Sequence, residues 1–101
     1  MPEYNAPLRD MRFVMDELLD MTGSYAAYGL EDATPDLVSA ILEEGAKFTN
    51  QVLSPLNRSG DEEGCHIENG VVTTPKGFKE AYQAYCENGW GSMTASPEYG
   101  G

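Results

Sequence analysis

Apolar residues recur every three or four positions in three stretches of this 101-residue chain, and this spacing predicts three helices. The helices are expected over residues 8–20, 35–53 and 75–88, after an extended leader at residues 1–7 that contains two prolines. The residues of the three apolar faces are Leu8, Met11, Met15, Leu18 and Leu19, then Leu37, Val38, Ile41, Leu42, Phe48, Val52 and Leu53, and finally Phe78, Ala81, Tyr82, Tyr85 and Cys86.

Capping residues indicate where these helices begin. Thr34 can cap the second helix, and Pro35 suits its first position, where no backbone N–H is needed. Thr74 followed by Pro75 repeats the pattern and predicts the start of the third helix.

Two further residues predict helix ends. The second helix should end just before Pro55, because a proline removes a backbone donor and restricts the residue before it. Gly89 should end the third helix as a left-handed residue, with Trp90 packing on Tyr85.

The segments between the helices carry turn signals. Residues 21–33 are expected to form a connecting loop with at most one short turn, and the polar, acidic residues 57–64 a solvated loop. Asn69-Gly70, between short apolar stretches, predicts a small β-hairpin near 66–72. The fold class is therefore all-α, with that hairpin as its only sheet.

The second helix carries the widest apolar stripe, and Gly45 lies on it together with Ile41 and Phe48. Burying the stripe would contribute roughly 10–15 kcal/mol gross, but only if another surface covers it. Gly45 would let a neighbouring helix approach closely. These three residues are the candidates for packing against another domain.

Charge limits the classes of partner. Six Lys and Arg residues against seventeen Asp and Glu residues give a net charge of −11. This balance argues against nucleic acids and anionic membranes, which attract cationic surfaces. No apolar run approaches the roughly 20 residues of a membrane span, and no secretory signal is visible. The chain is expected in the cytoplasm, with Cys65 and Cys86 as free thiols.

The candidate chemical groups do not combine into a known site. His66 is the only histidine, and its spacing from Cys65 and Cys86 is not that of a zinc site. A calcium loop beginning at Asn57 would place Glu62 where the sharp turn requires glycine. We therefore predict no catalytic, cofactor-binding or metal-ligating residue.

Several motifs nevertheless resemble those of one enzyme family, in the same order along nearly the whole chain. The stretches are Tyr4-Asn5-Ala6-Pro7-Leu8-Arg9-Asp10-Met11-Arg12-Phe13, Val52-Leu53-Ser54-Pro55-Leu56-Asn57-Arg58 with Gly60-Asp61-Glu62-Glu63-Gly64, Thr74-Pro75-Lys76-Gly77-Phe78 with Tyr82, and Trp90 with Ser96-Pro97-Glu98-Tyr99-Gly100-Gly101. Together they resemble the start of the acyl-CoA dehydrogenases, in their larger bacterial branch.

The resemblance implies an FAD-dependent flavoprotein oxidoreductase of fatty acid metabolism, which removes hydrogens from the α and β carbons of an acyl-CoA thioester. A carboxylate base takes the α proton and FAD accepts the β hydride. Residues 8–101 would be part of the N-terminal helical domain, without the flavin-binding middle and C-terminal domains, which supply the base and the FAD site. Tyr99, Gly100 and Gly101 would lie nearest the acyl pocket.

Two interpretations follow. In the first, the chain is the truncated N-terminal part of such an enzyme, is catalytically silent and binds no FAD, and its partners are the enzyme's remaining domains. In the second, it is a stand-alone acidic helical module that binds another protein through the uncovered stripe. The first interpretation predicts self-association or marginal stability of the isolated chain, because apolar surface meant for the absent domains stays wet.

Overall fold

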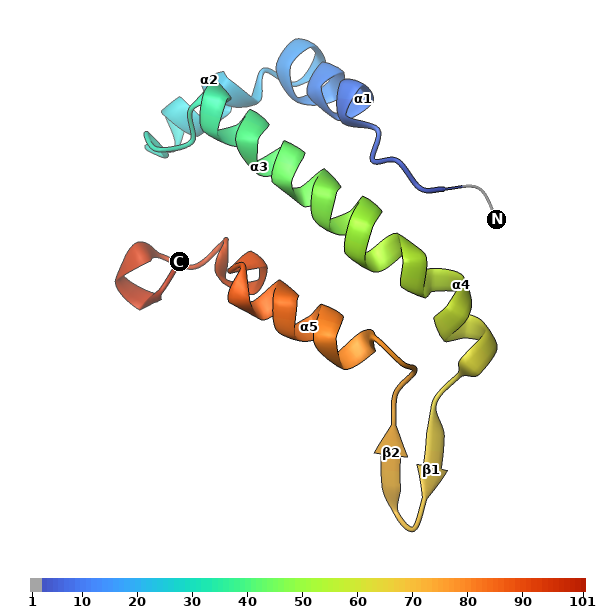
Figure 1. Cartoon of the computed structure of the whole chain (residues 1–101). Coiled ribbons are helices and arrows are strands. Elements are labelled where there is room, and N and C mark those ends of the chain that lie inside the picture. The colour runs from blue at the N-terminus through green and yellow to red at the C-terminus, as the bar shows by residue number, and fades with distance from the viewer. Residues whose placement is uncertain (1–2) are drawn as a thin grey trace. The chain divides into compact units, whose positions relative to one another are not determined.

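The computed structural model describes residues 3–101 and is mostly helical, with one small antiparallel sheet (Figure 1). The predicted all-α class with a short hairpin is therefore confirmed. The chain divides into two compact units, one ending at Ser54 and the other comprising Pro55–Gly101. We describe each unit by itself.

The first unit contains three α-helices and two π-helical segments. The α-helices are α1 (Leu8–Arg12), α2 (Met21–Ala27) and α3 (Pro35–Phe48), and the π-helical segments are η1 (Phe13–Leu18) and η2 (Thr49–Leu53). Helix α1 contacts α3, and the backbone N–H of Ala6 donates a hydrogen bond to Asn50 Oδ1 in η2 at 3.1 Å. Residues 3–7 of the predicted leader are therefore held at η2, and its residues 1–2 lie outside the described residues.

The first predicted helix is found, but it ends at Leu18 instead of Asp20, and α2 follows where a loop was expected. Asp20 adopts a left-handed conformation, with φ of 46°, and its Oδ1 accepts a hydrogen bond from the N–H of Gly23. Such a side chain can cap a new helix after a sharp change in chain direction. The expectation of a connecting loop was wrong for residues 21–27, which form α2, and right for residues 28–33, which form turns. Residues 21–27 have no apolar period that would predict a helix, and the cap at Asp20 is what begins it.

Helix α3 begins as predicted. Thr34 is its N-cap, with its Oγ1 accepting a hydrogen bond from Leu37 N–H at 3.2 Å, and Pro35 occupies the first turn. Asp36 lies near the positive end of the helix dipole.

The predicted end of this helix at residue 53 was wrong, because helical backbone continues through Pro55. In the π-helical turn η2, the N–H of Ser54 donates to the C=O of Thr49, five residues earlier instead of four. This wider pattern shifts the hydrogen bonding by one residue just before the proline, where an α-helix would lose a bond and clash with the ring. The π turn thus gives a physical reason why Pro55 is tolerated.

The second unit consists of α4 (Ser54–Glu63, which starts on the last residue of the first unit), β1 (His66–Glu68), β2 (Val71–Thr73), α5 (Phe78–Glu87) and the 3-10 turns η3 (Trp90–Ser92) and η4 (Pro97–Tyr99). Helix α4 contradicts the predicted acidic loop over 57–64. Its sequence is polar because most of its side chains are exposed, but Gly60 is buried.

The predicted hairpin is confirmed. Ile67 pairs with Val72 and Glu68 with Val71 in an antiparallel register. The turn residues Asn69 and Gly70 have φ values of 53° and 78°, the positive values that a tight two-residue hairpin requires.

Helix α5 begins three residues later than the expected start at Pro75. The N-cap is Gly77, whose φ of 92° is left-handed and stops the helix from extending backwards. The N–H of Lys76 donates instead to Glu63 Oε2 at 2.7 Å, at the end of α4. The predicted end is confirmed, because α5 stops at Glu87 and Gly89 is left-handed with φ of 78°.

Two glycines bring the segments of the second unit close together. A Cβ on Gly60 would lie 2.5 Å from the ring of Phe78, and one on Gly77 would lie 2.7 Å from a methyl of Leu56. Among the described residues, only Gly60, Pro75 and Ala81 are buried. Each unit is therefore a set of contacts between helices without an extended hydrophobic core.

Candidate functional site

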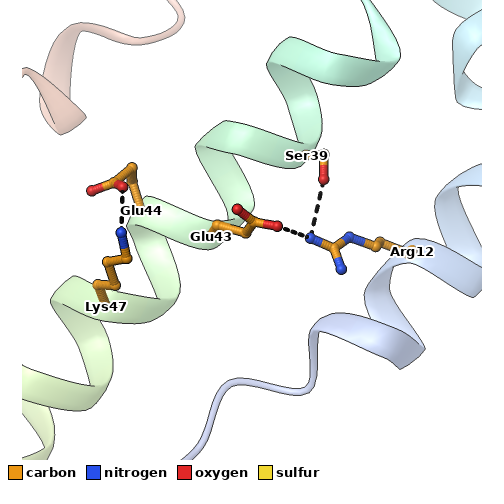
Figure 2. A network of polar contacts seen from close by, with 5 residues as sticks. All are labelled: Arg12, Ser39, Glu43, Glu44 and Lys47. Carbon is orange, nitrogen blue, oxygen red and sulfur yellow. Dashed lines mark hydrogen bonds and ion pairs between the residues drawn. The ribbon is translucent and has the colours of Figure 1, made fainter.

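Arg12 forms the most connected polar cluster of the first unit. One terminal nitrogen of its guanidinium donates to Ser39 Oγ at 3.0 Å and to Glu43 Oε1 at 2.9 Å, so that the end of α1 is tied to the middle of α3 (Figure 2). The guanidinium Nε is buried and has no hydrogen-bond partner in the part of the chain that the structure describes. The arrangement holds two helices together through a partly exposed charge.

A small hollow lies beside this cluster. Its volume is about 50 Å³, and it is lined by Arg12, Met15, Asp16, Pro35, Val38, Ser39 and Leu42. Pockets that bind small molecules and cofactors usually have about 300–1,000 Å³. The residues at this hollow therefore do not fit a flavin or an acyl-CoA, and we derive no catalytic step from them.

Lys47 and Glu44 form a second ion pair one turn further along α3, at 2.8 Å (Figure 2). This hydrogen bond and the negative charge of Glu44 raise the pKa of the Lys47 ammonium. Both side chains are exposed, so the pair contributes little to stability.

The three residues predicted to pack against another domain lie on α3. Ile41, Gly45 and Phe48 are all partly exposed, and their spacing of four and three places them on one side of the helix. The structure thus leaves some of their surface accessible.

The residues predicted to lie near an acyl pocket are close to one another at the chain's last turn. Tyr99 ends η4 and is 80% exposed, Gly100 is left-handed with φ of 92°, and the N–H of Gly101 donates to the carbonyl of Ser96. The turn begins at Ser96, whose Oγ accepts a hydrogen bond from Glu98 N–H. An exposed tyrosine is therefore held on an ordered turn.

The cysteines and the histidine do not converge. Cys65 and Cys86 are exposed free thiols, and His66 is exposed in β1. No group of three or more metal-ligating side chains occurs among residues 3–101. Within the same residues, no helix has the length and apolar character needed to cross a bilayer.

Tyr82 is the second group whose titration is shifted. Its hydrogen bond with the Cys86 side chain, and the charge that Cys86 carries when ionised, raise the pKa of the phenol. The ring of Tyr82 stacks on Tyr85, with ring centroids 6.4 Å apart. This group of side chains lies on the surface of α5.

The sequence pointed to neither Arg12 nor Gly60. Arg12 lies in a motif that carried the family resemblance, but nothing in the sequence indicates its partners 27 and 31 residues away. The sequence does contain a signal for Gly60 that our prediction missed. Val52, Leu56 and Gly60 continue the apolar stripe at intervals of four, and all three are at least partly buried.

The chain is thus a mostly helical segment with many exposed apolar side chains. No protein-family model matches it. Its sequence is 36% identical to 3-methylmercaptopropionyl-CoA dehydrogenase of Ruegeria pomeroyi over 103 aligned residues, and 34% identical to butyryl-CoA dehydrogenase of Syntrophomonas wolfei over 97. The chain is a homologue of a region of acyl-CoA dehydrogenases, as the resemblance predicted.

These matches cover 97% and 87% of the chain but only 17% and 15% of the two relatives. The homology therefore applies to nearly every element described above.

Proposed function

We propose that this chain is the N-terminal helical part of an FAD-dependent acyl-CoA dehydrogenase, in which it covers the flavin-bearing body and carries out no chemistry itself. The observation that carries the proposal is the homology to two acyl-CoA dehydrogenases along almost the whole chain. The exposed cysteines are compatible with a reducing cytoplasm, where we place the enzyme.

The remainder of the enzyme would bind FAD, which would supply the hydride-accepting chemistry of acyl-CoA dehydrogenation. The residues of this chain provide surface instead. Eighteen large hydrophobic side chains are exposed among the described residues, including Leu18 at 66% and Tyr82 at 69%. When a partner surface removes such side chains from water, the free energy falls by about 25 cal/mol per Å² of apolar surface buried.

The α3 stripe is the proposed contact with the body. Ile41, Gly45 and Phe48 retain accessible surface while the rest of α3 is anchored by Arg12 and by the cap at Thr34. A preformed helix face loses little conformational freedom when it docks, which favours binding.

The turn at Tyr99-Gly100-Gly101 is the proposed wall of the acyl pocket. Tyr99 can present a large apolar ring with a polar tip, a combination suited to a partly wet pocket lining. The left-handed Gly100 fixes the chain direction after the ring.

The experiment compares two proteins, the 101-residue chain and the longer product of the same reading frame. The longer protein is expected to be yellow and to lose its oxidised-flavin absorbance when an acyl-CoA thioester is added anaerobically. The 101-residue chain is expected to be colourless and inactive. A flavin spectrum from the 101-residue chain, or a longer product that binds no flavin, would overturn the proposal.

A further inference from the structure

The hairpin β1–β2 leaves an apolar face uncovered. Ile67 and Val72 pair across the strands and are 72% and 63% exposed. The hairpin extends away from α4 and α5 within its unit (Figure 1). A two-stranded hairpin of this length is at best marginally stable in water without further packing.

The two faces of the hairpin differ in chemistry. Paired residues share a face and successive residues alternate, so Ile67 and Val72 form one face while Val71 lies opposite Glu68 on the other. Val71 is as exposed as Val72, at 62%, but its neighbour is a carboxylate that requires water or a cationic partner. Only the Ile67–Val72 face is apolar at both positions.

We propose that the Ile67–Val72 face is a docking surface for the remainder of the same polypeptide in the parent enzyme. This inference rests on the proposed function, because it requires a longer protein. It adds a contact surface on the second unit to the one proposed on α3 of the first.

The size of the surface selects the occupant. A stable interface between free proteins usually involves about 20–30 residues on each side, whereas the two strands of the hairpin have three residues each. A partner within the same polypeptide is already present at an effective concentration in the millimolar range, so a small patch suffices. The chain spans 17% of the Ruegeria relative, so an enzyme of that length has ample further surface.

The test uses the longer protein with two substitutions, Val72→Lys, which faces Ile67, and Val71→Lys, which faces Glu68 and can form a weak cross-strand ion pair with it. They alter adjacent residues of the same type, in the same strand and with nearly equal exposure. Val72→Lys is expected to lower the melting temperature by at least about 2 °C, because it places a charge in the docked interface. Val71→Lys should change it by less than half of that shift.

The milder pair Val72→Thr and Val71→Thr repeats the comparison without a charge and keeps a β-branched side chain, in case the lysine variant does not fold. The same difference between the two positions is expected, with a smaller shift. Equal shifts at both positions, in either pair, would overturn the inference.

Light scattering on the 101-residue chain tests the alternative occupant of this face, which is a second copy of the chain. If that chain formed a dimer that Val72→Lys dissociates, the surface would belong to a second copy and the inference would be wrong. A monomer, or an oligomer that Val72→Lys leaves intact, supports it. Failure of the proposed function gives a different signal, because the unsubstituted longer protein would then bind no flavin.

Discussion

The two units of the chain differ in the kind of contact that fixes the segments within each unit. In the first, polar side chains link segments far apart in sequence, as Arg12 does with Ser39 and Glu43. In the second, glycines let apolar groups approach closely, as at Gly60 and Phe78. A chain with little buried surface can therefore fix its helices either by directed hydrogen bonds or by close steric packing. Substitutions that disturb these two kinds of contact should change its stability in different ways.

Disturbing the steric fit at Gly60 should lower the free energy of unfolding more than the other substitutions below. Gly60→Ala places a methyl group 2.5 Å from the Phe78 ring, and overpacking of this kind typically costs about 1–3 kcal/mol. Alanine's better helix propensity returns about 1 kcal/mol at most. We therefore expect net destabilisation in denaturant unfolding followed by circular dichroism.

Gly91→Ala is the control, since its added methyl would sit at an ordinary 3.5 Å from Tyr85. If Gly60→Ala proved no less stable than Gly91→Ala, steric fit would not be what organises the second unit. Gly60→Ala combined with Phe78→Leu should recover part of the loss, because the smaller side chain makes room.

Removing the hydrogen bonds of Arg12 should lower the free energy of unfolding by an intermediate amount, which depends on salt concentration. Arg12→Ala removes two hydrogen bonds between α1 and α3, and we expect it to lower the free energy of unfolding by about 1 kcal/mol. Thermal melts at low and high salt would measure it. Part of the loss should disappear at high salt, because screening weakens the ion pair with Glu43 in the unsubstituted chain.

Arg58→Ala is the matched control. Arg58 pairs with Glu62 four residues along the same helix, at the same 2.9 Å, so its loss should matter less than that of a link between helices. Equal effects of the two substitutions would show that Arg12 does not hold the first unit together.

The exposed ion pair Lys47–Glu44 on α3 should have the smallest effect on stability, and it should be visible only at alkaline pH. The pKa of Lys47 is raised in the folded chain, so its stabilising contribution is complete below the ordinary lysine pKa and is lost as pH rises through the raised value. We expect a slight loss of helical signal in that range. Glu44→Gln, which removes the cause of the shift, should reduce this loss, and an unchanged alkaline titration would contradict the assignment.

The sequence predicted much of the local structure because caps and turns are local. Thr34, Asn69-Gly70 and Gly89 behave as predicted, since each needs only its immediate neighbours. The prediction failed at Pro55, where a π turn removes the conflict that normally ends a helix. It also failed over 57–64, because a helix with one narrow buried side is polar in composition and resembles a loop.

Long-range contacts were the other part that the sequence could not supply. The partners of Arg12 and the contact of Gly60 with Phe78 depend on how helices meet, which periodicity alone does not determine. The proposed contact residues Ile41, Gly45 and Phe48 and the turn at Tyr99-Gly100-Gly101 came from the stripe pattern and the family resemblance. Their roles remain predictions.

The central claim is that the exposed apolar side chains of this chain are covered by the rest of an acyl-CoA dehydrogenase. Amide hydrogen exchange of the same 101 residues, measured in the isolated chain and in the longer protein, tests it most directly. We expect at least tenfold slower exchange in the longer protein around Ile41 to Phe48 and in the hairpin. Equal exchange rates in the two proteins at both places would contradict it.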